Sequence, residues 1–243
     1  LKMLSVNYST DTLTFDPKGK ILQVDFAKEA VKQGQTSIGL KSKTHVVLLA
    51  LKMQAHELAT HQEKIYDVDD HIGMVFSGLT ADARYICKLM RNEALNYWYT
   101  NNSQHPIERM VNKIAQKSQK KTSTAHKRPF GVGCLVAGID EAGTHLFETC
   151  PSANFYEYKA MAIGAKCQSA KTYLEKNFDK FENASRQELI EHGVKALRAS
   201  AQEEDLTLNN VSIAVVSADE KFHLLEGAEL GKFIGDEGRM DVS

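Results

Sequence analysis

The segment Tyr8-Ser-Thr-Asp-Thr-Leu-Thr-Phe-Asp-Pro-Lys-Gly-Lys-Ile-Leu-Gln-Val-Asp-Phe-Ala27 is a polar, proline-containing stretch that runs into an amphipathic pattern. Asp16 can accept hydrogen bonds from free backbone N–H groups, and Pro17 suits the first turn of a helix. Gly34 lies where a left-handed helix cap is expected. The pattern predicts a helix over residues 18–33. Its apolar residues recur at helical spacing, at Ile21, Val24, Ala27 and Val31.

After this helix, apolar and branched runs separated by short turns predict buried strands. Two amphipathic helices should follow, one over residues 79–97 with Thr80 as its N-cap and one over residues 107–115 with Pro106 near its start. The strands of this first block are expected at residues 36–41, 45–51, 64–68 and 72–77.

The second half of the chain repeats the order of strands followed by two helices. One helix is traced by apolar residues between 170 and 181, and the next opens with a capping box formed by Ser185 and Glu188. Because strands and helices arrive in blocks, an α+β layered fold is favoured over a doubly wound parallel sheet. The strands are expected at residues 131–138, 144–148, 155–159, 161–163, 211–216 and 221–225.

The composition is that of an ordinary soluble globular protein, with 42% hydrophobic and 25% charged residues among 243. No linker or repeat appears, so we expect one domain over residues 1–243, ending in a polar, mobile tail at 235–243. A net charge of −1 argues against nucleic acid as a partner. No apolar run is long enough to span a membrane. Four well-separated cysteines and no visible signal peptide favour reduced thiols in the cytosol.

No motif assembles an active site. The histidines of His56-Glu57-Leu-Ala-Thr-His61 are five positions apart, whereas the zinc-protease motif needs four. The basic stretch 117–128 could bind phosphate, but a solvated helix end is favoured because no aromatic residue interleaves with its charges before Phe130. Neither the P-loop pattern nor Gly-x-Ser-x-Gly occurs. We therefore expect no catalytic residue, no metal and no cofactor.

The segment over residues 8–27 closely resembles the N-terminal signature of proteasome alpha subunits. The resemblance spans residues 8 to about 234, and the stretch 154–175 is most similar to the eukaryotic type-1 branch of that family. Further matches occur in the order the family has them, at residues 29–34, 77–84, 128–133, 151–154 and 162–165.

This resemblance implies a four-layer αββα sandwich of the N-terminal-nucleophile hydrolase type, with an additional N-terminal helix. It implies a place in the 20S proteasome, where seven-membered alpha rings lie outside two beta rings. The expected partners are other alpha subunits, beta subunits of the inner ring, and C-terminal tails of regulatory-particle ATPases or other activators. The expected role is in ATP- and ubiquitin-dependent protein degradation in the cytoplasm and nucleus.

The resemblance also implies that the chain is not an enzyme. Catalytic beta relatives use an N-terminal threonine whose own amine helps to move the proton. By similarity the nucleophile position falls at Gln35, which has no hydroxyl, and the supporting aspartate position falls at Leu51. A shift of one residue would bring Thr36 into place. A free amine would still be missing there unless the chain were cleaved.

A pocket between alpha subunits, which receives the tails of activators, is implied as well. In the family a lysine of this pocket pairs with the tail carboxylate, and the matching residue is Lys64. Gly34 and Asp25 match the other contact positions, and Asp25 is shorter than the more usual glutamate. Taken without the family, Lys64 is more typical of a solvated lysine at the end of a strand.

Residues 1–16 would contribute to the gate over the central pore. In the family, side chains at the positions of Tyr8, Pro17 and Phe26 belong to a cluster that holds the open gate by hydrogen bonds. Ser9 stands where many alpha subunits have aspartate, and Phe26 where they have tyrosine. Because Ser9 has no charge and Phe26 no hydroxyl, we expect a weaker open-gate cluster.

Two alternatives remain. A free-standing amidohydrolase of the N-terminal-nucleophile type would need processing that exposes a nucleophile at or near Thr36. A scaffold module outside the proteasome would need no such processing, but the signature over residues 8–27 weighs against it. An intact N-terminal segment would exclude the first alternative, and the native mass would test the second.

Overall fold

Branched and leucine-rich runs build two antiparallel sheets of five strands each. The computed structural model describes residues 11, 13–54, 56, 58–201 and 205–234. The strand orders are β10-β9-β2-β1-β8 and β3-β4-β5-β6-β7. The first sheet comprises β1 (Ser37–Lys41), β2 (His45–Leu51), β8 (Ala160–Ile163), β9 (Val211–Ser217) and β10 (His223–Leu224). The second comprises β3 (Ile65–Asp69), β4 (Ile72–Gly78), β5 (Val132–Asp140), β6 (Gly143–Thr149) and β7 (Phe155–Glu157).

The sheets pack face to face because each central strand has apolar side chains on both of its faces. Along β2, Val46 and Leu48 lie in the cluster between the sheets, where they meet Val75 of the second sheet. Val47 and Leu49 point the other way, into the cluster that packs under helices. Burial on both faces explains why these strands appear in the sequence as continuous apolar runs.

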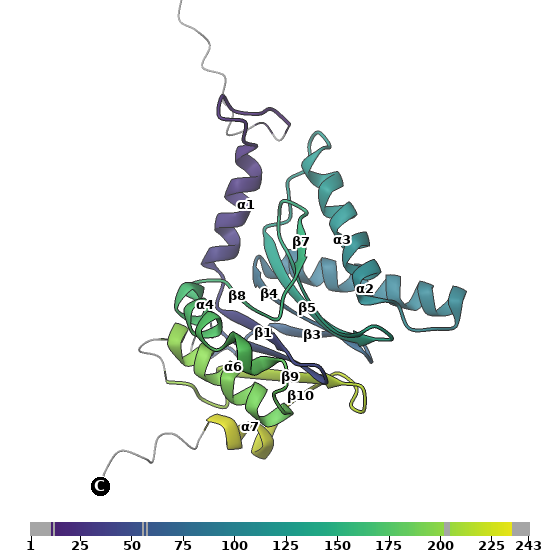
Figure 1. The fold of residues 1–243 in the computed structure, drawn as a ribbon. Coiled ribbons are helices and arrows are strands. Elements are labelled where there is room, and N and C mark those ends of the chain that lie inside the picture. The colour runs from purple at the N-terminus through teal and green to yellow at the C-terminus, as the bar shows by residue number, and fades with distance from the viewer. Residues whose placement is uncertain (1–10, 12, 55, 57, 202–204, 235–243) are drawn as a thin grey trace, which may run out of the picture.

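Helices cover the outer face of each sheet and give four layers (Figure 1). The predicted αββα sandwich is therefore confirmed, with one helix, α7, that the sequence pattern did not indicate. The second sheet is covered by α2 (Thr80–Asn101) and α3 (Ile107–Thr122). The first is covered by α4 (Cys167–Lys176), α5 (Phe178–Phe181) and α6 (Arg186–Ala201), with α7 (Gly227–Ile234) packed against α6.

The additional N-terminal helix is present as α1 (Leu22–Gln33). It ends at residue 33 as predicted, but its predicted start at residue 18 and the left-handed cap expected at Gly34 were wrong. The Asp16 carboxylate accepts hydrogen bonds from the backbone N–H groups of Lys18 and Lys20, at 2.9 and 2.7 Å. These bonds close a turn in which Gly19 has φ +76°, so the helix begins only after it. At the other end Gly34 is extended, with φ −72° and ψ 153°, rather than left-handed.

Two further helix predictions need correction, and one is confirmed. Thr80 is the first residue of α2 and makes no N-cap hydrogen bond. The helix expected between residues 170 and 181 is two helices, because the backbone leaves helical geometry at Asn177 (φ −112°, ψ 11°). The capping box is present: Ser185 N–H donates to the Glu188 carboxylate at 2.9 Å, and Glu188 N–H reaches the Ser185 hydroxyl at 3.4 Å.

The predicted tail at 235–243 and most of the segment 1–16 lie outside the described residues. The single-domain prediction for residues 1–243 stays a prediction. Within the described ranges, every helix is too short or too polar to cross a membrane.

A buried carboxylate fastens the start of α2 to the second sheet. Asp82 accepts two hydrogen bonds from the Arg128 guanidinium, at 2.6 and 2.9 Å, and one from the Gly131 backbone at 2.9 Å. Burial alone would raise the pKa of Asp82, but the bonds from Arg128 and Gly131 lower it below its usual value. The negative charge at the first turn also suits the positive end of the helix dipole.

We predict that Asp82→Asn lowers the free energy of unfolding by about 2 kcal/mol, because charge-assisted hydrogen bonds contribute about 1.5–3 kcal/mol. Urea unfolding of the purified chain measures this loss. Asp179→Asn is the matched control, since Asp179 is exposed on α5. A midpoint for Asp82→Asn equal to that of the control would contradict the anchoring role.

Candidate functional site

Gln35 and Thr36, at and beside the family's nucleophile position, do not offer a free nucleophile. Gln35 lies between α1 and β1, and its backbone carbonyl accepts a hydrogen bond from Lys64 Nζ at 2.6 Å. Thr36 is buried, and its hydroxyl donates to the Ala165 carbonyl at 2.6 Å. Leu51 is buried in the apolar cluster beneath α6. An apolar side chain at this position cannot support proton transfer.

Lys64 directly precedes β3 and is buried, with 6% of its surface exposed. Its ammonium donates to the Gln35 carbonyl and lies 5.7 Å from the centre of the Phe76 ring. Burial lowers the pKa of Lys64 to about 7. Lys64 is therefore not the solvated lysine that the residue type alone favoured, but a buried amine with little contact with water.

A cavity of about 240 Å³ opens above Lys64 at the end of α1. Met53 and Leu79 are half exposed and give it an apolar rim. The Gln62 side-chain amide donates to the Thr80 hydroxyl at 2.8 Å and ties the loop before β3 to α2. The cavity is lined by Ala30, Gln33, Gly34, Gln35, Met53, Gln62, Lys64, Phe76, Gly78, Leu79 and Thr80.

The electrostatic environment of this cavity favours an anion. The first turn of α2 borders it through Thr80, and a helix N-terminus carries partial positive charge. The carbonyls at the end of α1 are already engaged. Val31 O accepts from Gly34 N–H and the Ser77 hydroxyl, and Gly34 O accepts from Ala165 N–H at 2.6 Å. A carboxylate would therefore meet Lys64 and the start of α2, whose first turn also carries Asp82.

The structure brings two of the three predicted pocket residues together. Gly34 lines the cavity beside Lys64, and a Cβ atom at Gly34 would overlap the Gly78 nitrogen and the Ser77 hydroxyl. Asp25 does not line it. It lies nine residues earlier on α1, roughly 13 Å along the helix axis at 1.5 Å per residue, and pairs with Lys28 at 3.8 Å.

The predicted gate residues are placed only in part. Tyr8 lies outside the described residues. Pro17 belongs to the turn that precedes α1, and Phe26 is 51% exposed on α1. Pro17 and Phe26 thus lie on the N-terminal side of the helix whose other end forms the cavity.

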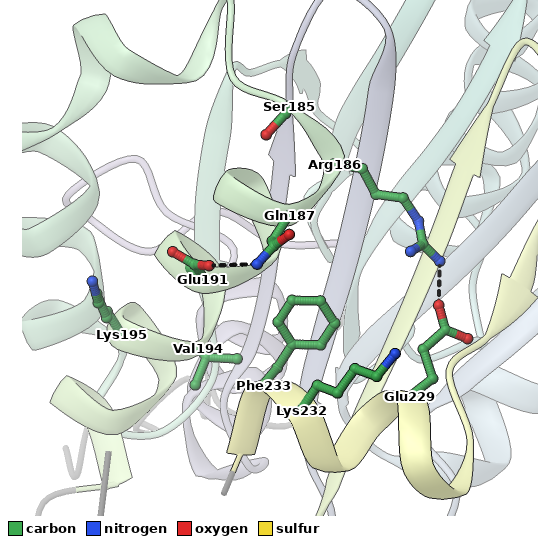
Figure 2. A pocket seen from close by; sticks show the side chains of 9 residues that line it. All are labelled: Ser185, Arg186, Gln187, Glu191, Val194, Lys195, Glu229, Lys232 and Phe233. Atoms are coloured by element: carbon green, nitrogen blue, oxygen red, sulfur yellow. Dashed lines mark hydrogen bonds and ion pairs between the residues drawn. The ribbon is translucent and has the colours of Figure 1, made fainter. Parts of the chain in front are cut away.

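A larger cavity of about 710 Å³ lies between α6 and α7 (Figure 2). Some of its charged groups are paired. Arg186 of α6 faces Glu229 of α7 at 2.7 Å, and the Gln187 amide reaches the Glu191 carboxylate at 3.3 Å. None of the residues singled out from the sequence as pocket or gate residues lines it.

Sequence reasoning missed most of the cavity wall, namely Met53, Gln62, Phe76, Leu79 and Thr80. These residues come from separate segments, and no spacing along the chain links them. As for metals, no group of three or more His, Cys, Asp or Glu side chains in the described ranges could hold an ion. Glu57 of the His56–His61 motif falls outside those ranges.

Comparison with known proteins identifies the family. The family described as proteasome subunit matches residues 31–216. Over 229 residues the chain is 49% identical to proteasome subunit alpha type-1 of Dictyostelium discoideum, covering 93% of this chain and 92% of that protein. It is 42% identical over 240 residues to the probable proteasome subunit alpha type-6 of Schizosaccharomyces pombe, covering 97% and 88%. It is 40% identical over 236 residues to proteasome subunit alpha type-1 of Drosophila melanogaster, covering 96% and 85%.

These matches confirm the resemblance to proteasome alpha subunits that the sequence predicted. The chain belongs to the proteasome subunit family, as a non-catalytic alpha-type subunit of the proteasome core similar to type-1 subunits.

Proposed function

We propose that the chain builds the outer seven-membered ring of the proteasome, receives activator tails and contributes to the gate that admits substrates. The observation that carries this proposal is the cationic cavity formed by Lys64 and the end of α1. In this role the subunit serves ATP- and ubiquitin-dependent protein degradation in the cytoplasm and nucleus. Its neighbours are other alpha subunits and the beta subunits of the inner ring.

The shape and charge of the cavity suit the C-terminus of a peptide chain. At about 240 Å³ it is smaller than the roughly 300–1,000 Å³ of pockets for drug-sized ligands. Lys64 provides a point charge for the terminal carboxylate, and Met53 and Leu79 provide apolar contact for the side chains that precede it. Capture of a terminal carboxylate is a recurring mode of peptide recognition.

Apolar surface before and on α1 supports the gate proposal. Phe15 and Phe26 are each more than half exposed, and Leu13 is also exposed. Each of these side chains would lose contact with water if another chain covered this part of the molecule. On the family resemblance, the segment 1–16 would contribute to the gate over the pore.

A second apolar surface, at the end of α2, supports assembly. Leu95, Trp98 and Tyr99 are 66%, 51% and 91% exposed within five positions of one helix. Tryptophan and tyrosine are enriched at protein interfaces. We assign this surface, residues 95, 98 and 99, to the contact with a neighbouring proteasome subunit.

Lys64→Ala should weaken docking of an activator tail at this subunit about tenfold or more, because hydrogen bonds to charged groups contribute about 1.5–3 kcal/mol. The measurement is crosslinking of a photoreactive activator-tail peptide to this chain within the assembled particle. Lys88→Ala on the exposed face of α2 is the matched control. Equal crosslinking of the two variants would rule out Lys64 as the docking cation.

The double variant Ser9→Asp plus Phe26→Tyr should raise the basal peptidase activity of the whole particle. It restores the charge and the hydroxyl that hold the open gate in the family. Phe178→Tyr, which adds a hydroxyl at an exposed phenylalanine of α5, is the control and should leave activity unchanged. If the double variant behaves like this control, the open-gate cluster does not depend on these two positions.

Trp98→Ser plus Tyr99→Ser should reduce incorporation of the chain into the assembled particle, because it removes apolar surface that assembly would bury. Quantitative mass spectrometry of purified particles measures incorporation against the wild-type chain. Leu208→Ser, at an exposed leucine distant in sequence, serves as the control. Incorporation equal to that of Leu208→Ser would show that this surface is not an assembly contact.

A further inference from the structure

The Lys64 ammonium has one hydrogen-bond partner among the described residues, the neutral Gln35 carbonyl. No carboxylate in the described ranges forms an ion pair with it. Asp82 lies in the first turn of α2, which borders the cavity. Its carboxylate is paired with the Arg128 guanidinium at 2.6 Å. In the loop before β3, the Glu63 carboxylate opposes the lowering of the Lys52 pKa by burial, whereas burial is the cause of the lowered pKa of Lys64.

This environment stabilises the neutral amine relative to the ammonium. A buried cation loses hydration, and one carbonyl does not replace it. Burial accordingly brings the pKa of Lys64 from 10.5 to about 7. Near neutral pH the empty cavity is therefore divided between a charged and an uncharged form.

A carboxylate bound in the cavity would instead stabilise the ammonium form of Lys64 relative to the neutral amine. An opposite charge within about 4–6 Å favours the protonated form of a lysine. The ammonium can then donate to the carboxylate as well as to the Gln35 carbonyl. Because the ligand binds the protonated form more tightly, ligand binding and proton binding are linked, and each strengthens the other.

We propose that docking of a C-terminal carboxylate at this cavity is coupled to uptake of one proton by Lys64, so that docking weakens as the pH rises above neutral. The proposal rests on the docking function proposed above and adds its regulation. At pH values where the empty cavity is already protonated, docking requires no proton and is independent of pH. Above that range, affinity falls by up to about tenfold per pH unit, since one proton must be taken up.

The test uses assembled particles and a synthetic peptide with the C-terminal sequence of an activator, carrying a photoreactive group near its end. The amount of this chain crosslinked, measured by mass spectrometry, gives the apparent Kd at this subunit alone from pH 6 to pH 9. The same peptide with an amidated C-terminus, which cannot form the ion pair, controls for other titrations. Lys64→Arg supplies a cation that stays charged over the whole range.

For wild-type particles we expect a Kd that is flat below about pH 7 and rises close to tenfold between pH 7.5 and pH 8.5. The amidated peptide and the Lys64→Arg particle should show no such rise. A wild-type Kd as flat as that of the amidated peptide would overturn the proton coupling while leaving docking intact. A Lys64→Ala particle that binds the free-acid peptide as tightly as wild type at every pH would overturn the docking function itself.

Discussion

The close approach of the chain at Gly34 to the end of β4 is the constraint on which the site depends. A side chain at Gly34 would overlap the Gly78 nitrogen, so only glycine lets α1 end directly against the second sheet. The same junction carries α1 into β1 and holds the Gln35 carbonyl above Lys64. It also runs the backbone continuously through the position where a catalytic relative needs a free amine. The lack of a nucleophile also follows from the residue types at Gln35 and Leu51, whereas the cavity depends on the Gly34 junction.

The layered fold could be predicted from the sequence because the strands are buried on both faces. The β2 run over residues 45–51 has no polar interruption, and its bounds agree with the structure. Helix ends were less predictable. Asp16 and Pro17 are typical of a helix start, but the Asp16 carboxylate bonds the backbone of a turn that Gly19 closes, and α1 begins later. Asp16 therefore binds backbone N–H groups as predicted, but it does so in a turn that precedes the helix rather than at the helix start.

The candidate site could be predicted only through single residues. Lys64 and Gly34 were identified by resemblance, and the structure places them at one cavity. Met53 and Leu79 gave no signal, because their roles arise where a loop and the start of a helix converge on the end of α1. The sequence could not indicate that Lys64 is buried, because a lysine at the end of a strand is usually solvated. Tertiary packing turns this lysine from a surface charge into a buried group whose pKa is lowered to about 7.

The central claim is that this chain works as a non-catalytic subunit inside a large proteolytic particle. The most direct measurement is the native mass of the particle that copurifies with a tagged version of the chain from its own cells. The account predicts a species of the size of the full four-ring assembly, with peptidase activity that a threonine-directed inhibitor blocks. A monomer or small homo-oligomer without such activity would contradict it, and would favour the free-standing alternatives over a place in the ring.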